Sequence, residues 1–131
     1  VTPVWSGDES MSNHYSTSVL KDGYLYGFDG RQEFGQTLRC VELATGKVMW
    51  NERQPGKGSV SYADGRLYCR NEGAKGTVYL VDADPKKYEE RGRFDQPDRS
   101  KEQAWAHPVV ANGKLYIRDQ DVLLCYDVRA K

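Results

Sequence analysis

The chain has 131 residues, a length typical of one domain, and its 19 basic residues balance its 19 acidic ones. This balance argues against the strong electrostatic footprint of a nucleic-acid binder or of a protein that binds anionic membranes. No apolar run approaches the roughly 20 residues of a membrane-spanning helix. The N-terminus carries neither an initiator Met nor a signal-peptide pattern, so we expect a processed or excised chain.

Three segments of the chain repeat one pattern, a strand followed by an Asp-Gly or Asn-Gly turn and a second strand. They lie at 19–26, 61–68 and 109–116, and their turn glycines are Gly23, Gly65 and Gly113, separated by 42 and 48 residues. Asp-Gly or Asn-Gly between two β-rich runs predicts a hairpin with a tight turn. The longer second spacing places extra residues in the polar loop 95–103, because surface loops tolerate insertions.

A third strand is expected after each hairpin, and an acidic residue occupies the same place in each one. These strands lie at 38–43, 78–83 and 123–128, and the acids are Glu42, Asp82 and Asp127. Fourth strands are expected at 47–52 and 88–94. The first residues, 2–5, look like a lone fourth strand in which Trp5 corresponds to Trp50. No segment shows the apolar spacing of a helix, so we predict essentially none.

Four short antiparallel strands in forty-odd residues are typical of a β-propeller blade. The sequence therefore predicts an all-β fold of about three blades, either an incomplete ring or half of a six-bladed ring formed by a dimer. The expected parts are a fourth strand at 2–5, a blade at 15–54, a second blade at 58–95 and a partial blade at 105–129. Three blades leave open sheet edges, because propellers close with about four to eight.

The segment Cys40-Val-Glu-Leu-Ala-Thr-Gly-Lys-Val-Met-Trp50 resembles the tryptophan-docking repeat of quinoprotein (PQQ-like) propellers. Cys40 stands where that repeat usually has Ala, and Glu42 where it has Asp. The second blade keeps only the first half of the pattern, with Glu90 expected at the position of the tryptophan. The segments 57–68, 105–110 and 126–129 are similar to the C-terminal part of bacterial PQQ-like repeat proteins.

The resemblance implies a periplasmic or extracellular scaffold or protein-interaction module without catalytic activity. Its partner would be another protein, the remaining propeller blades, or a second copy that closes the ring. Two alternatives stay open: a portion of a quinoprotein-like enzyme whose catalytic residues lie elsewhere, and a self-assembling ring that binds a carbohydrate or a peptide. The resemblance places PQQ on the ring axis beneath a vicinal disulfide and beside calcium. Because this chain has no vicinal cysteine pair, we expect neither cofactor.

Other candidate chemistry receives a structural interpretation. The three cysteines are odd in number and lack a Cys-x-x-Cys pair, which predicts neither a disulfide framework nor a zinc site. Cys40 and Cys125 are expected to be buried thiols too far apart to bridge. Asp119 and Asp121 alternate as in loops that bind hard cations, but their position predicts a hairpin turn. Neither His14 nor His107 has ligand-type residues at a suitable spacing.

The longer loops give the best binding hypothesis, because loops held by a rigid scaffold commonly carry function. We expect Tyr15 and Trp105 at equivalent positions on one face, and Arg70 and Arg118 at equivalent strand ends. Aromatic residues together with arginine are frequent at the centres of protein interfaces. The alternative is that these rings pack beneath the loops. His107 is placed at the same face, although its position before Pro108 also favours an extended backbone.

Overall fold

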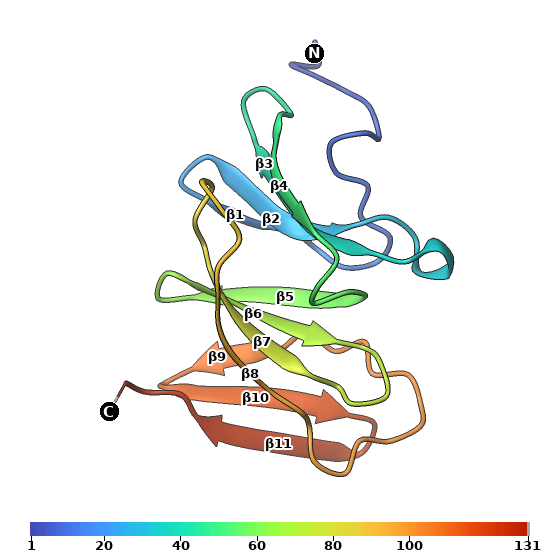
Figure 1. Ribbon diagram of the computed structural model, residues 1–131, viewed down its shortest axis with the longest axis vertical. Helices are drawn as coiled ribbons and strands as arrows, with labels where there is room; N and C mark the ends of the chain where they lie inside the picture. Colours follow the sequence, from blue (N-terminus) through green and yellow to red (C-terminus); the bar gives the residue numbers. More distant parts are fainter. Residues whose placement is uncertain (131) are drawn as a thin grey trace.

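The protein is built from three antiparallel sheets stacked along the long axis of the molecule (Figure 1). The computed structural model describes residues 1–130, apart from the side chain of Gln32. The first sheet contains β1 (Val19–Lys21), β2 (Tyr24–Asp29), β3 (Thr37–Glu42) and β4 (Val48–Glu52), and the second β5 (Gly58–Ala63), β6 (Arg66–Asn71), β7 (Val78–Asp82) and β8 (Glu90–Phe94). The third sheet contains β9 (Val109–Ala111), β10 (Lys114–Asp119) and β11 (Val122–Asp127).

Every sheet is a meander in which strands adjacent in sequence pair side by side. The first strand of the second sheet, β5, contacts β1 and β2 on one side and β9 on the other. The first strands of the three sheets therefore lie closest to one another, and the later strands spread away from them. The prediction of an all-β chain is confirmed, since η1 (Gln32–Phe34) is the single helical turn in residues 1–130. Within those residues, no helix has the length and apolar character needed to cross a membrane.

The three repeated turns have the same conformation. Gly23, Gly65 and Gly113 have φ values of 82°, 77° and 71°, and the residue before each glycine also has a positive φ. Two consecutive positive φ values define the type I′ turn, which matches the twist of the flanking strands. In each repeat the carbonyl of the turn glycine accepts a hydrogen bond from the amide of the residue that follows the acid of the third strand. The donors are the amides of Leu43, Ala83 and Val128, at 2.9, 3.1 and 3.0 Å. The sequence repeat is thus a structural repeat.

The lone strand expected at 2–5 does not form, so the chain has eleven strands rather than twelve across residues 1–130. A strand needs a neighbour to satisfy its backbone groups, and within residues 1–130 no strand pairs with residues 2–5. The Trp5 side chain nevertheless contacts the turn between β3 and β4. Its Nε1 donates to the Leu43 carbonyl at 2.6 Å, and its ring lies against Gly46. The Trp50 Nε1 likewise donates to the Asp84 carbonyl of the second sheet, at 2.8 Å.

The apolar core lies in two parts, one in each space between sheets. The larger part joins the first and second sheets and includes Tyr26, Phe28, Leu38, Cys40, Trp50, Val60, Leu67, Cys69, Tyr79 and Val81. The smaller part joins the second and third sheets around Val78, Leu115 and Ile117, with partly buried Tyr68, Phe94, Val110, Leu124, Tyr126 and Val128.

Strand register corrects the expected position of the tryptophan in the second repeat. Cys40 pairs with Trp50 in the first sheet, whereas the equivalent Leu80 pairs with Gly92 in the second. Glycine, and not Glu90, therefore occupies the place of the indole. The connection between β7 and β8 is two residues longer than that between β3 and β4, and an alignment by sequence spacing misses this insertion.

The cysteines also differ in part from expectation. Cys40 and Cys69 are buried, but Cys125 is exposed, because β11 has no fourth strand or further sheet to cover it. All three are free thiols. Burial raises the pKa of Cys40 to about 11 and also raises that of Cys69, so both remain protonated and unreactive near neutral pH.

Candidate binding face

Two aromatic residues from distant parts of the sequence meet on the surface. Tyr15 and Trp105 lie with ring centroids 5.4 Å apart and planes tilted by 50°, and the His14 ring lies 4.9 Å from that of Tyr15. The two larger rings are 42% and 53% exposed. The structure therefore places the two aromatic residues in contact with each other and leaves about half of each ring exposed to solvent.

Arg118 lies next to this aromatic pair. With Trp105 it lines a shallow hollow of about 230 Å³, which Gln103, Ala104, Ala106 and Gln120 complete. Arg118 is exposed at the end of β10, and its Nε donates to the Gln120 carbonyl at 2.9 Å. A guanidinium fixed on one side is well placed to bind a carboxylate or a carbonyl oxygen. We call Tyr15, Trp105 and Arg118 the loop face.

Arg70 does not belong to this exposed surface, although the sequence placed it there. It is 1% exposed, and its guanidinium donates to the Ala104 carbonyl at 2.8 Å and to Gln96 Oε1. Burial lowers the pKa of Arg70, and the positive charge of Arg99 lowers it further. Because Ala104 directly precedes Trp105, Arg70 supports the loop face from below rather than contacting a ligand.

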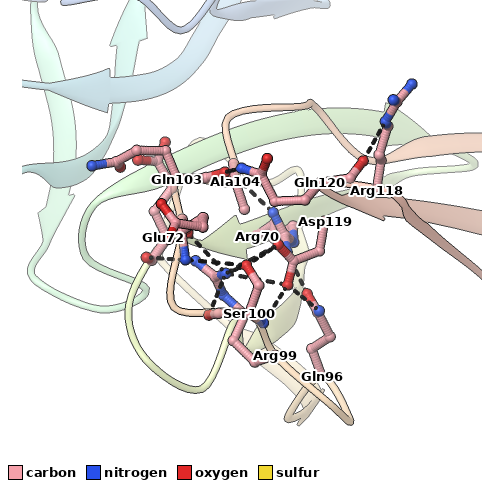
Figure 2. A network of polar contacts seen from close by, with 11 residues as sticks. Arg70, Glu72, Gln96, Arg99, Ser100, Gln103, Ala104, Arg118, Asp119 and Gln120 are labelled. Carbon is pink, nitrogen blue, oxygen red and sulfur yellow. Dashed lines mark hydrogen bonds and ion pairs between the residues drawn. The ribbon is translucent and has the colours of Figure 1, made fainter.

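Asp119 is the centre of the polar group beneath the loop face, shown in Figure 2. Its carboxylate accepts hydrogen bonds from Gln96 Nε2 at 2.8 Å and from the Ser100 amide at 2.8 Å and hydroxyl at 2.6 Å. Arg99 Nη1 lies 3.2 Å from the same carboxylate, and both side chains are almost fully buried. We call Arg70, Gln96, Arg99, Ser100 and Asp119 the Asp119 cluster.

The hydrogen bonds determine the charge state of Asp119. Burial alone would raise the pKa of its carboxyl group, but hydrogen bonds from Ser100 and Gln96 and the charge of Arg99 outweigh burial and lower the pKa to about 2. Asp119 is therefore ionised at neutral pH and fully engaged by donors. An acid in this state holds the loop 95–105 in place and is poorly suited to accept a proton from a substrate.

Glu72 connects the Asp119 cluster to the aromatic pair. Its carboxylate accepts a hydrogen bond from the Tyr15 hydroxyl at 2.9 Å and lies 3.7 Å from Lys57 Nζ, and its carbonyl accepts from Arg99 at 3.3 Å. Burial and this bond to Glu72 raise the pKa of Tyr15, which keeps its hydroxyl protonated. Residues of the second and third sheets, and of the loops that carry Tyr15 and Trp105, thus hold the side chains of the loop face in place.

The His107 side chain lies against β5. Its Nδ1 is 3.3 Å from the Val60 carbonyl, and the following residue, Pro108, accepts a hydrogen bond from Ser61 Oγ through its carbonyl. The residue therefore links the third sheet to β5. This arrangement agrees with the extended backbone that the sequence suggested before Pro108.

The sequence did not identify Asp119, Gln96, Arg99 or Ser100 as a group. One signal was present: Leu115, Ile117 and Asp119 alternate along β10, and all three are buried. Alternation places the three side chains on one face of the strand, so an acid at this position needs buried donors. Its donors come from the polar loop 95–103, which the sequence had suggested as an insertion and as part of a binding face, but not as a partner of Asp119.

No metal centre is formed by the residues that the structure describes, in that no three of their His, Cys, Asp and Glu side chains gather at one place. Asp119 and Asp121 flank the β10–β11 turn as the sequence predicted, with Gln120 at a φ of 54°. The carboxylate of Asp119 faces the Asp119 cluster, while Asp121 is exposed. Comparison of the sequence with protein-family models and with curated proteins finds no match.

Proposed function

We propose that the chain is a non-catalytic scaffold of three β-propeller blades that presents the loop face to a protein partner. The equivalent type I′ turns support the likeness to PQQ-like repeats, as do the Trp5 and Trp50 indoles, which each donate to a backbone carbonyl just after a third strand. By the same likeness, the protein acts in the periplasm or outside the cell, without PQQ or calcium.

One observation carries the interaction function: Tyr15 and Trp105 are exposed, yet they are held in place. Ring contacts and the Glu72 hydrogen bond fix Tyr15, and the Arg70 bond to Ala104 fixes the backbone beside Trp105. Exposed aromatic residues that lose little conformational freedom on binding are typical of interface hot spots. Arg118 adds a donor group beside them, which favours a peptide segment with an aromatic and an acidic residue.

This function can be tested by selecting peptides from a random library against the wild-type chain and then measuring their binding to single variants. We expect the selected peptides to contain aromatic and acidic residues and to bind Trp105→Ala and Arg118→Ala at least tenfold more weakly than wild type. The matched control is Leu20→Ala, which removes an exposed side chain from β1 and should bind like wild type. Peptides that bind all three variants equally well would place the interaction surface elsewhere.

A second observation favours assembly with further strands or blades. β11 is the edge strand of the third sheet, whereas each of the equivalent strands β3 and β7 pairs with a fourth strand. β11 exposes Val122 and Leu123, at 43% and 65%. An apolar edge of this kind favours pairing with a strand from another chain, either a second copy or further blades of the same ring.

Light scattering over a range of concentrations tests whether copies of this chain supply the missing strand. Ring closure by a second copy predicts a dimer that Leu123→Lys dissociates, while the matched variant Lys86→Glu, an exposed residue between β7 and β8 of the middle sheet, leaves the dimer intact. A wild-type chain that stays monomeric at all concentrations contradicts closure by a second copy and leaves further blades as the partner of β11.

A further inference from the structure

The two spaces between sheets have the same framework, but only the first contains an indole. In the first, Trp50 lies opposite Cys40, packs 6.0 Å from Tyr26 and 5.7 Å from Tyr88, and donates to the Asp84 carbonyl. In the second, the residue at the register position of Trp50 is Gly92. Tyr26 in the first and Tyr68 in the second are equivalent, because each lies three positions after its turn glycine.

An apolar pocket lies where the indole is missing. It has a volume of about 380 Å³, and its walls include Tyr68, Leu80, Gly92, Phe94, Leu115 and Tyr126. A Cβ atom added to Gly92 would meet no other atom within 4 Å. The pocket is thus open at the point where a side chain would enter from β8. Apolar pockets of this size, enclosed by aromatic residues, are typical sites for small molecules.

The walls of the pocket favour a flat aromatic ring. Phe94 and Tyr126 lie with ring centroids 4.7 Å apart at one side, and Tyr68 provides the ring equivalent to the one that contacts Trp50. Aromatic rings pack well against one another in tilted and edge-to-face arrangements. Burying such a ring also removes apolar surface from water.

The charged groups at the rim are paired with each other. Arg93 binds Glu90 through two hydrogen bonds of 2.6 and 2.8 Å, and Arg129 binds Asp127 through Nε at 3.0 Å. Lys114 also lies 3.1 Å from Asp127. Since the guanidinium groups already have carboxylate partners, the rim favours a neutral ligand over a charged one.

The backbone carbonyl that accepts from Trp50 indicates which hydrogen-bonding group a ligand of the pocket would carry. The carbonyl that accepts from Trp50 belongs to Asp84, two residues after the acid Asp82. The equivalent residue in the third repeat, two after Asp127, is Arg129, which lines the pocket. A ligand with a ring N–H can reproduce the arrangement of Trp50 with its acceptor.

We propose that the pocket between the second and third sheets binds a small neutral aromatic molecule of the indole class, in the place that Trp50 fills between the first and second. This site is separate from the loop face and does not depend on the proposed function. The walls come from both sheets, so a bound ring also holds the third sheet against the second.

Indole itself is a suitable probe, and amide chemical shifts of the full chain give a residue-specific readout. We expect saturable shifts at Gly92, Phe94 and Tyr126, with a dissociation constant on the order of 100 μM to 1 mM. Absence of saturable shifts at up to about tenfold that concentration, or shifts confined to the loop face, would overturn the proposal.

Gly92→Trp supplies the ring from within the chain and should abolish indole binding. It should also raise the melting temperature by roughly 5 °C, because it fills the space as Trp50 does. Leu20→Trp, a matched variant that adds an indole on β1 away from the pocket, should bind indole like wild type. Gly92→Leu provides a second way of filling the pocket if the tryptophan variant does not fold. Unchanged indole binding in a folded Gly92 variant would contradict the assignment.

Discussion

The space between the first and second sheets and the space between the second and third are built on the same strand register from different residues. The position five residues after the turn glycine holds Phe28 in the first repeat and Arg70 in the second, and both are buried. The first space is filled by apolar side chains and by Trp50. The second has a smaller apolar core, an open pocket at Gly92 and a buried charged cluster at the opposite end of the strands.

This comparison shows that the backbone repeat and the means of joining neighbouring sheets are separable. Turn geometry and the hydrogen bonds of the turn glycines fix the shape of each sheet. Apolar burial then joins the first and second sheets, while hydrogen bonds to buried charged side chains make a large part of the contact between the second and third sheets. Buried charges require all of their partners. The contact between the second and third sheets, here called the second joint, should therefore lose more stability on single substitutions and on changes of pH than the contact between the first and second sheets, the first joint.

The largest expected effect comes from removing the indole between the first two sheets. Trp50→Ala should lower the free energy of unfolding by about 3–5 kcal/mol, because it leaves a cavity and removes the hydrogen bond to Asp84. Urea denaturation measures the loss. Trp105→Ala, which removes an exposed indole, should cost less than about 1 kcal/mol. Equal losses in the two variants would show that the indole does not join the first two sheets.

A somewhat smaller loss is expected when the Asp119 cluster is broken. Asp119→Ala leaves Arg99 buried without its carboxylate partner and should cost about 3 kcal/mol. Urea denaturation again provides the measurement, with the exposed Asp121→Ala as the control at close to zero. A loss below about 1 kcal/mol would mean that the Asp119 cluster contributes little to holding the third sheet.

The pKa of Asp119 gives the second joint a pH dependence. Its folded pKa of about 2 is below the ordinary value of 3.8, so ionised Asp119 stabilises the folded chain above about pH 4. That contribution, about 2 kcal/mol, is lost as the pH falls from about 4 to 2. Unfolding free energies measured across this range should converge for wild type and Asp119→Asn. Parallel curves would indicate that the folded and unfolded pKa values are alike.

The smallest effect tests the backbone that both joints share. Gly65→Ala places a Cβ at a φ of 77° and should cost about 1 kcal/mol. Gly92→Ala is the matched control, because Gly92 has no positive φ and the space around it is open. It should leave stability unchanged or raise it by about 0.5 kcal/mol. Thermal unfolding of the two variants separates strain at the turn from a general cost of losing glycine.

The parts of the fold that depend on local chemistry were predictable from the sequence. Asp-Gly and Asn-Gly between β-rich runs were sufficient to predict all three hairpins, because few residues other than Gly, Asn and Asp adopt two consecutive positive φ values. The Trp5 indole donates to a backbone carbonyl, as the Trp50 indole does, but the strand predicted at 2–5 does not form. Strand formation at 2–5 depends on a neighbouring strand that these residues do not specify.

The site was predictable only where exposure follows from loop position. Tyr15 and Trp105, expected at equivalent positions on one face, are exposed and in contact, but Arg70 and Arg118, equivalent in sequence, have opposite exposures. The difference arises because the loop 95–105 folds over Arg70 and supplies Gln96 and the Ala104 carbonyl as partners. The residues next to Arg70 in the sequence do not indicate that a loop about 30 residues later will cover its side chain. The glycine at the tryptophan position was missed because spacing alone does not reveal the longer β7–β8 connection.

The meander order of every sheet has a consequence for how the chain folds. Since each strand pairs with the one before it, most backbone pairing requires only short loops to close, and each sheet can begin to form as soon as its own residues are available. The middle sheet alone has a neighbour on both sides, so its amide hydrogens should exchange most slowly with solvent. Local opening should start at the two outer sheets and reach the middle one only on global unfolding.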